Sequence, residues 1–246
     1  MRMIDRLAAI GLSFFHYDTL DSTNSEAKRR ASELSLPAVL VADAQSAGRG
    51  RMGRDFFSPK DTGLYFSYVT EIRQRETTVG LTAAAAVAAA RAIARTTGRE
   101  CTIKWVNDLL LDGKKVAGIL CECFGADDRL FAVVGIGINI GTVDFPEELR
   151  KKAGSLGISS DVREHLTASL AEELHALVTA LPDRSFMEEY RTRSAVLGRR
   201  VHYVQNGVAY EGEAIAIDDG GGLLVKDGEG REHLLASGEI SLAYEW

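Results

Sequence analysis

At 246 residues, the chain is long enough for one large domain, or for a large and a small domain, with an ample core. Its formal net charge of −6 argues against a general nucleic-acid binder, which would carry a strongly basic domain. The sequence has neither a run of about 18 apolar residues nor a signal-peptide core, which excludes a membrane span and indicates a cytoplasmic protein. The three cysteines show no zinc-ligand spacing, so we expect buried thiols.

The N-terminal part of the chain alternates strand and helix patterns. Runs rich in aromatic and β-branched residues predict strands over 14–17, 38–42, 63–70 and 130–140. Thr23 and Glu26 match a capping box, which predicts a helix from Thr23 to Leu34. An alanine-rich stretch predicts a second helix over 77–97, with Gly98 as its end.

Residues 45–59, the Arg-Gly loop, carry the strongest functional signal. Arginines alternate with glycines in this loop: Gly48, Arg49, Gly50, Arg51, Gly53 and Arg54. Each guanidinium can grip a phosphate or carboxylate in two places, and glycine lets the backbone approach a ligand closely, so the loop is predicted to bind an anion. A solvated basic linker is the alternative, but a plain linker has no need of the Phe56–Phe57 pair.

The glycine spacing also matches the dinucleotide fingerprint G-x-G-x-x-G. That motif requires a helix directly after its third glycine. Here Pro59 follows without a helical pattern, so we reject a Rossmann site.

A second polar group lies within residues 101–120. The segment is predicted to form a strand, a short polar stretch at Asn107 and Asp108, and a hairpin that turns at Asp112–Gly113. Lys104 lies in an apolar strand, where it either reaches the surface or faces a phosphate. Asp108 is a Mg²⁺ ligand or a turn residue, because magnesium prefers one or two carboxylates together with phosphate oxygens.

Two further residues lie at strand ends. Lys115 begins the returning strand of the hairpin, either as a ligand contact or as an exposed lysine. Asn139 ends the strand over 130–140 and either hydrogen-bonds a ligand or forms a turn. Glycines within that strand indicate a close approach of a ligand or of another backbone.

The pattern changes after residue 145. Helices are predicted over 146–152, 161–180 and 183–197. Five short strands follow, over 200–204, 208–217, 222–226, 231–235 and 239–244, and they predict a small β-barrel. We therefore expect an α+β fold with two domains, residues 1–196 and 197–246.

Four motifs, in this order, resemble the biotin protein ligase family, also called biotin–[acetyl-CoA carboxylase] ligases. They are Asp21–Asn24, Gly48–Arg54, Lys104–Asp108 with Lys115–Leu120, and Gly135–Asn139. The resemblance implies a central mixed β-sheet flanked by helices, similar to class II synthetases, with a small C-terminal SH3-like β-barrel. It also implies the activity: biotin is activated with ATP to biotinyl-5′-AMP and transferred to a lysine of a biotin carboxyl carrier protein.

The resemblance assigns roles to individual residues. The biotin-binding residues would be Ser22, Thr23, Asn24, Gln45, Gly48, Arg49, Gly50, Arg51, Lys115 and Gly118. The ATP-binding residues would be Arg51, Arg54, Phe56, Lys104, Asn107 and Asn139, with Mg²⁺ at Asp108. The catalytic residues would be Lys115, Arg51 and Lys104.

The chain departs from the family pattern at two positions. Val106 replaces the proline of the Lys-Trp-Pro-Asn-Asp motif, and Phe56 replaces a tryptophan. A phenylalanine ring can still stack on adenine, so we expect ATP binding to survive. The catalytic motifs begin by residue 21, without the helix-turn-helix of the family's repressor members, so we expect a monofunctional ligase that does not bind DNA.

Two rival functions remain. A lipoate or octanoate ligase or transferase of related fold would need a mostly apolar tunnel in place of the hydrogen-bonding groups Ser22, Thr23 and Gln45. A non-enzymatic regulator that binds an adenylate would not need the full set of basic residues. The sequence leaves monomer and homodimer as alternatives.

Overall fold

The computed structural model describes residues 2–73, 78–205, 208–236, 238 and 240–242. Its largest element is a seven-stranded sheet in the order β1-β2-β3-β7-β6-β5-β4. The strands are β1 (Ser13–Leu20), β2 (Ala38–Gln45), β3 (Gly63–Glu71), β4 (Thr102–Lys104), β5 (Asp108–Leu111), β6 (Lys114–Ala126) and β7 (Arg129–Asn139). β1 and β2 are parallel, whereas the other neighbours are antiparallel, so the predicted mixed sheet is confirmed.

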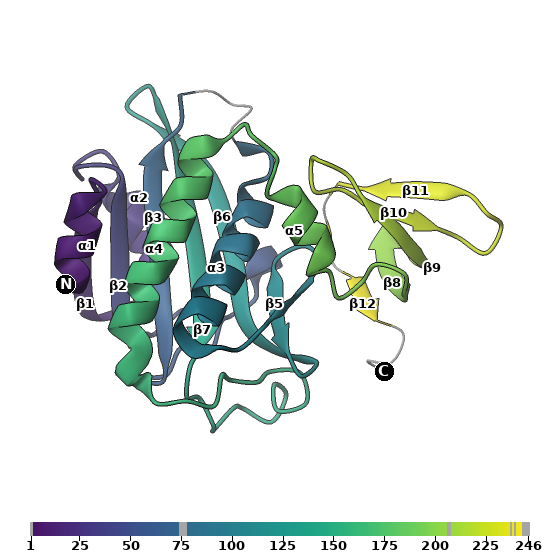
Figure 1. Cartoon of the computed structure of the whole chain (residues 1–246), viewed down its shortest axis with the longest axis horizontal. Coiled ribbons are helices and arrows are strands. Elements are labelled where there is room, and N and C mark those ends of the chain that lie inside the picture. Colours follow the sequence, from purple (N-terminus) through teal and green to yellow (C-terminus); the bar gives the residue numbers. More distant parts are fainter. Residues whose placement is uncertain (1, 74–77, 206–207, 237, 239, 243–246) are drawn as a thin grey trace.

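Helices cover the two faces of this sheet unequally (Figure 1). On one face lie α3 (Leu81–Thr97) and α4 (Arg163–Ala180), with α1 (Met3–Ala9) packed against α4. On the other face, α2 (Thr23–Arg30) packs on β2, β3 and β7. Beyond α2 this second face carries no helix in the described chain, which leaves room for the Arg-Gly loop.

The alternation of side chains along β7 shows how the sequence divides the two faces. Val134, Ile136 and Ile138 point into the large core under α3 and α4. Phe131 and Val133 point to the other face and pack under α2. On that second face the next two positions are Gly135 and Gly137, so the apolar layer stops where a cavity begins.

Two turn predictions are confirmed by backbone geometry. Gly98 ends α3 with a φ of 70°, the left-handed conformation that glycine adopts without strain. Asp112 and Gly113 have φ values of 51° and 76° and join β5 to β6, as the hairpin signal predicted. The helix predicted from residue 77 starts later, at Leu81 with Gly80 as its N-cap residue, and residue 77 itself lies outside the described residues.

The capping-box prediction at the start of α2 is wrong. Ser22 is the N-cap residue of the helix, and no side chain caps the helix there. The Thr23 hydroxyl instead donates to Gln45 Oε1 at 3.2 Å, and Glu26 accepts from Arg29. Thr23 therefore bonds to a distant strand and Glu26 bonds along its own helix, so neither makes the capping bond that the motif suggested.

Of two further helix predictions, the first is wrong and the second is too long. Residues 146–152 form turns, and the segment then pairs with β6: the Lys115 N–H donates to the Lys152 carbonyl and the Gly154 N–H to the Lys115 carbonyl, both at 2.8 Å. This pairing with β6 replaces a regular helix. The helix predicted over 183–197 is only α5 (Met187–Thr192), and the chain around Ser194 bridges to Ile103 of β4.

The C-terminal part is a five-stranded antiparallel sheet, in the order β11-β10-β9-β8-β12. Its strands match the five predicted: β8 (Arg200–Gln205), β9 (Val208–Ile217), β10 (Leu223–Lys226), β11 (Glu232–Leu235) and β12 (Ile240–Leu242). The predicted turn at 206–207 lies outside the described residues. Trp105 connects the two sheets through a hydrogen bond: its buried indole N–H donates to the Gly221 carbonyl at 2.8 Å. In the described residues, no helix is long and apolar enough to cross a membrane.

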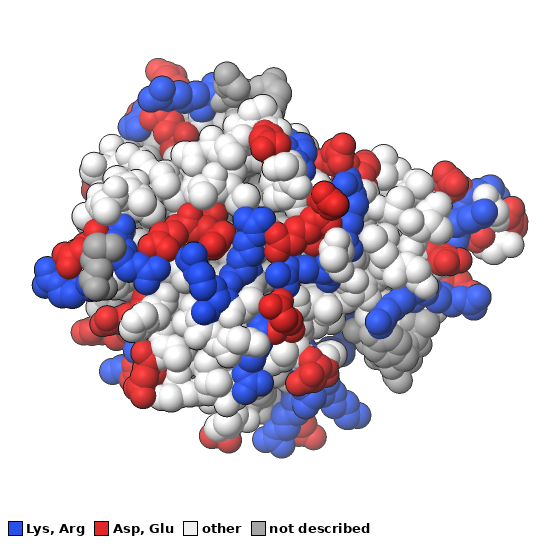
Figure 2. All heavy atoms as spheres, in the orientation of Figure 1, with Lys and Arg blue, Asp and Glu red and all other residues white. Residues whose placement is uncertain are grey.

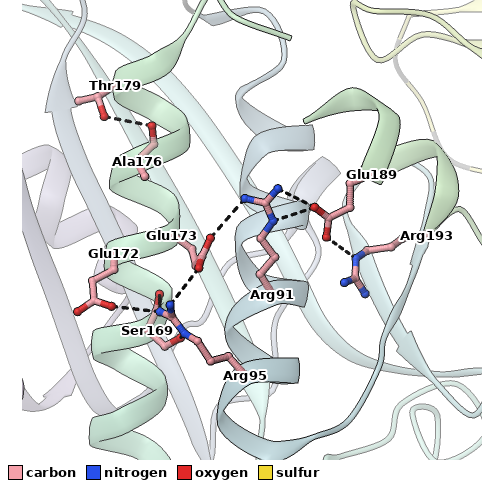
Figure 3. Close-up of polar contacts among 9 residues, drawn as sticks. All are labelled: Arg91, Arg95, Ser169, Glu172, Glu173, Ala176, Thr179, Glu189 and Arg193. Carbon is pink, nitrogen blue, oxygen red and sulfur yellow. Dashed lines mark hydrogen bonds and ion pairs between the residues drawn. The ribbon is translucent and has the colours of Figure 1, made fainter. Parts of the chain in front are cut away.

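A chain of ion pairs joins the helices on the α3–α4 face. Figure 2 shows acidic and basic side chains alternating across this face, and Figure 3 shows the central part. Successive pairs are separated by 2.6–3.4 Å and run through Arg6, Glu172, Arg95, Glu173, Arg91, Glu189, Arg193 and Glu100. This network connects α1, α4, α3 and α5, and its members are half-buried to exposed.

We predict that Arg91→Met destabilises the protein by about 1 kcal/mol, because it removes two partly exposed pairs of this network. The loss corresponds to about 2–4 °C in Tm for a chain of this size. High salt should shrink the difference, since screening weakens the wild-type pairs. Thermal unfolding at low and high NaCl tests this, with Arg200→Met as control, because Arg200 makes one pair of 3.8 Å. An equal loss at both salt concentrations would attribute the effect to packing of the arginine stem.

Candidate active site

A cavity opens beside α2, on the face of the large sheet that lacks α3 and α4. Eleven of the predicted ligand-binding residues line it: Ser22, Thr23, Asn24, Gln45, Arg49, Gly50, Arg51, Phe56, Asn107, Lys115 and Gly118. They come from α2, β2, the Arg-Gly loop and the hairpin of β5 and β6, segments far apart in sequence. The roles assigned to them stay predictions, whereas their convergence on one cavity is observed.

The other five predicted site residues lie around this cavity and not among its lining residues. Gly48 is buried at the base of the Arg-Gly loop, and its carbonyl accepts from the Phe56 N–H at 2.9 Å. Arg54 is exposed on the loop. Lys104 lies opposite Asp108 in the pairing of β4 and β5, and Asn139 is buried at the end of β7 with its amide donating to the Gly154 carbonyl at 2.9 Å.

The Arg-Gly loop folds back on itself. Arg49 and Asp55 form an antiparallel bridge, and the Gly50 N–H donates to the Arg54 carbonyl at 2.7 Å. Its tip is a short 3₁₀ turn over Arg51–Gly53, in which exposed Met52 has a φ of 56°. The loop therefore holds its arginines on a compact hairpin, with the Arg49 and Arg51 side chains at the cavity.

Hydrogen bonds fix neutral polar groups that line the cavity. Gln45 Oε1 accepts from the Thr23 N–H at 2.9 Å, while its Nε2 donates to the Ser58 hydroxyl at 2.8 Å. Ser22 and Thr23 are buried, at 2% and 4% exposure. Such a rigid set of hydroxyl and amide groups suits a neutral ligand head that both donates and accepts hydrogen bonds.

Asn24 forms part of the cavity floor and is almost fully bonded within the protein. Its Nδ2 donates to the Leu120 carbonyl at 3.2 Å and to Glu122 Oε2 at 3.0 Å. Its Oδ1 accepts from the buried Ser67 hydroxyl at 2.6 Å. Asn24 thus supports the cavity wall through a fixed amide orientation.

Glycines of β6 and β7 form the rest of the floor. The Phe56 ring lies against Gly137 and Gly118, where an added Cβ would meet ring atoms at 2.4 Å and 3.3 Å. A Cβ on Gly135 would meet Asn24 Oδ1 at 2.2 Å. At these positions only glycine lets the aromatic ring and the amide approach the sheet.

Three cationic side chains face the cavity, each with a partner in the chain. Arg51 Nη1 donates to Asn107 Oδ1 at 3.1 Å, Lys115 Nζ lies 2.6 Å from Asp108 Oδ1, and Arg49 Nη1 lies 3.5 Å from Glu122 Oε1. Together with the neutral polar groups of the same lining, these cations can hold a ligand that has both hydrogen-bonding and anionic groups.

The surroundings of Asp108 fit a magnesium ion. Its Oδ1 is buried, lies beside the Lys115 ammonium and makes no hydrogen bond of regular geometry. One carboxylate together with nucleotide phosphate oxygens is a usual Mg²⁺ environment. Among the described residues, clustered His, Cys, Asp and Glu side chains occur elsewhere, at His16, Asp18 and Asp43 on the exposed β1–β2 edge, where Asp43 already pairs with Arg163.

The sequence interpretation missed two residues that support the site, Ser67 and Glu122, whereas it did connect the strand glycines, Gly135 among them, with a close approach of a ligand or backbone. Each missed residue carries a weak signal: Ser67 is a small polar residue between two aromatic residues of a strand, and Glu122 is a charge in an apolar strand. The alternation of β6 and β7 would have placed Glu122 and Gly135 on one face, but the sequence could not reveal that α2 brings Asn24 between them.

Comparison with known proteins gives a consistent result. A model of the Biotin/lipoate A/B protein ligase family matches residues 16–139, and a model of the biotin protein ligase C terminal domain matches residues 196–243. A bifunctional ligase/repressor BirA from Bacillus subtilis is 34% identical over 236 residues, 90% of this chain and 71% of that protein. A biotin–[acetyl-CoA-carboxylase] ligase from Mycobacterium tuberculosis is 30% identical, over 96% of this chain and 92% of that protein.

Solved structures agree with these sequence relatives. The biotin protein ligase from Aquifex aeolicus in complex with biotin and ATP superposes with a TM-score of 0.78 at 29% identity, over 94% of this chain and 98% of that one. The family models, the full-length relatives and the shared fold lead to one conclusion: this chain belongs to the biotin protein ligase family.

Proposed function

We propose that this protein activates biotin with ATP to biotinyl-5′-AMP and then transfers the biotinyl group to a lysine of a biotin carboxyl carrier protein. The observation that carries the proposal is the convergence of Arg49, Arg51 and Lys115 on the cavity that Ser22, Thr23 and Gln45 also line. The neutral hydrogen-bonding groups suit the ureido ring of biotin, and the cations suit its carboxylate and the phosphates of ATP.

In the first half-reaction, a carboxylate oxygen of biotin attacks the α-phosphorus of ATP, and pyrophosphate leaves. Biotin's carboxylate is ionised at neutral pH, so this step needs no general base. The rate then depends on positioning and on neutralising charge, which Lys115 and Arg51 supply at the cavity. Asp108 would hold Mg²⁺, which neutralises phosphate charge when bound.

The adenylate is a mixed anhydride that water would hydrolyse. The Arg-Gly loop, with Arg49, Gly50 and Arg51 at the cavity, is placed to close over it. In the second half-reaction the carrier lysine amine attacks the acyl carbon, an amide bond forms, and AMP leaves. The amine must first lose its proton, since only about one in a thousand such amines is neutral at pH 7.

Several finer assignments belong to the same proposal. Residues 1–196 would form the catalytic domain and 197–246 the SH3-like domain, a division supported by the C-terminal family model at 196–243. Free thiols and an ATP substrate are consistent with the cytoplasm. A homodimer and the absence of DNA binding stay predictions.

The test is incubation with ATP, labelled biotin and a biotin carboxyl carrier domain. We expect a mass gain of one biotinyl group on the carrier, dependent on both ATP and biotin. Lipoate or octanoate, offered in place of biotin, tests the rival ligase or transferase. Modification by those acids but not by biotin would overturn the proposal, and binding of biotinyl-AMP without transfer would favour a regulator.

Replacing Gly135 by alanine should raise the KM for biotin by about tenfold or more. The new Cβ would meet Asn24 Oδ1 at 2.2 Å, and Asn24 could move only by breaking its internal hydrogen bonds, each worth about 1–3 kcal/mol when a buried group is left unpaired. Gly125→Ala in β6 is the control, because its Cβ would meet only the Arg129 carbonyl at 3.8 Å. Steady-state kinetics with varied biotin would decide, and equal KM values for the two variants would contradict the prediction.

A further inference from the structure

One acidic side chain beside the cavity has no role in the reaction described above. Glu122 lies on β6, on the same face as Gly118 and Leu120, and only 18% of its side chain is exposed. Burial alone would raise the pKa of Glu122, but hydrogen bonds from Lys28 and Asn24 and the charge of Arg49 outweigh burial and lower it. The side chain is therefore a carboxylate at neutral pH.

This carboxylate joins three separate parts of the site. Its Oε2 accepts from Asn24 Nδ2 at 3.0 Å, on the cavity floor. Its Oε1 is bonded to Lys28 Nζ, one turn further along α2. Arg49 Nη1, from the Arg-Gly loop, lies 3.5 Å from the same oxygen. One side chain thus links β6, α2 and the loop.

The contact with Asn24 determines how that amide is oriented. The Nδ2 group faces two acceptors, Glu122 Oε2 and the Leu120 carbonyl, while Oδ1 faces the Ser67 hydroxyl. A flipped amide would place its oxygen against two other oxygens. Glu122 therefore helps keep the Asn24 amide in one orientation against Gly135.

The contact with Arg49 is of a different kind. It is long, and the Arg49 side chain is 47% exposed, so it holds the loop loosely. A guanidinium has five donors, so Arg49 can keep this contact and still reach a ligand. The ion pair therefore holds the loop loosely beside the cavity and leaves other N–H groups of Arg49 to bind an anionic ligand.

We propose that Glu122 is a positioning residue that orients Asn24 on the cavity floor and holds Arg49 of the Arg-Gly loop beside the cavity before the ligand binds. The expected changes in the KM for biotin rest on the proposed function, whereas the expected change in cleavage of the loop does not. Glutamine at position 122 still accepts from Asn24 but carries no charge to pair with Arg49 or with Lys28. Alanine removes the acceptor for Asn24 as well as the charge.

The structural arm of the test needs no substrate. Trypsin cleaves after arginine, and the loop offers Arg49, Arg51 and Arg54. Ligand-free Glu122→Gln should be cut in this loop about threefold to fivefold faster than wild type, the factor expected for loss of a partly exposed ion pair. Glu71→Gln is the matched control. Glu71 lies on β3, outside the cavity lining, and its carboxylate lies 2.6 Å from the Arg129 guanidinium. An unchanged cutting rate would overturn the proposal even if the protein proved not to be a ligase.

The kinetic arm asks whether Glu122 acts through Arg49. Glu122→Gln should raise the KM for biotin about threefold to fivefold and leave kcat within about twofold. Glu122→Ala should raise KM about tenfold to a hundredfold, because one N–H of the buried Asn24 amide then loses its acceptor, while the other keeps the Leu120 carbonyl. In an Arg49→Met background, the effect of Glu122→Gln should nearly vanish. An equal effect in both backgrounds, or a fall in KM, would overturn the role assigned to Glu122, whereas no turnover by wild type would overturn the proposed function instead.

Discussion

Lys115→Ala is expected to lower kcat/KM for biotinyl-adenylate formation by about 10²- to 10³-fold, the usual cost of removing one group that stabilises transition-state charge. Lys115 Nζ is at the cavity and lies 2.6 Å from Asp108 Oδ1. Without the lysine, the Asp108 carboxylate would lose its counter-charge beside the incoming phosphates. Most of the loss should therefore appear in kcat, because the lysine matters most when charge develops at the reacting phosphorus.

Pyrophosphate release in single-turnover conditions measures this step directly. Lys114→Ala is the matched control, because Lys114 is the exposed neighbour of Lys115 and does not line the cavity. If kcat/KM of the Lys115→Ala variant stayed within tenfold of the wild-type value, Lys115 would not be among the groups that neutralise charge in the transition state.

Arg51→Gly is expected to release biotinyl-adenylate about tenfold to a few hundredfold faster, the range for a lost charged hydrogen bond. Arg51 projects from the tip of the loop to Asn107 across the cavity, at 3.1 Å. Its removal takes away both a cation for the adenylate and the loop's contact with the β4–β5 segment. Adenylate that escapes acylates lysines at random, so bystander proteins should become biotinylated.

The control for this variant is Met52→Gly. Met52 is 76% exposed and has a φ of 56°, so glycine fits its backbone and adds flexibility to the same loop without removing a cation. Labelling of a non-carrier protein, compared with labelling of the carrier, gives the selectivity of each variant. If Met52→Gly labels bystanders as strongly as Arg51→Gly, the rigidity of the loop and not the Arg51 charge retains the adenylate.

The positions of Lys115 and Arg51 in the fold explain why these two substitutions should differ. Lys115 stands on a strand of the sheet, where neighbouring strands fix its backbone. Arg51 stands on a loop whose folding depends on a few internal bonds and on its contacts across the cavity. Loss of the first should therefore reduce chemistry, and loss of the second should reduce retention of the intermediate.

Local patterns in the sequence were enough to predict several features of this protein. The alternating strands of the sheet, the α3 helix ending at Gly98, the turn at Asp112–Gly113 and the five C-terminal strands all follow from short-range propensity and turn chemistry. The four motifs also predicted most cavity-lining residues, because the chemistry of each motif depends on residues close together in sequence.

The tertiary structure alone decided the remaining features, because they depend on contacts between distant segments. Thr23 bonds to Gln45 and not within its own helix, and the 152–154 segment pairs with β6 in place of forming a helix. Asn24, Ser67 and Glu122 become one bonded group only because α2 packs over β3 and the Asn24 side chain reaches Glu122 on β6. Neither periodicity nor spacing predicts that arrangement, since the hydrogen-bond partner of a buried polar group is set by whichever chain segment lies against it.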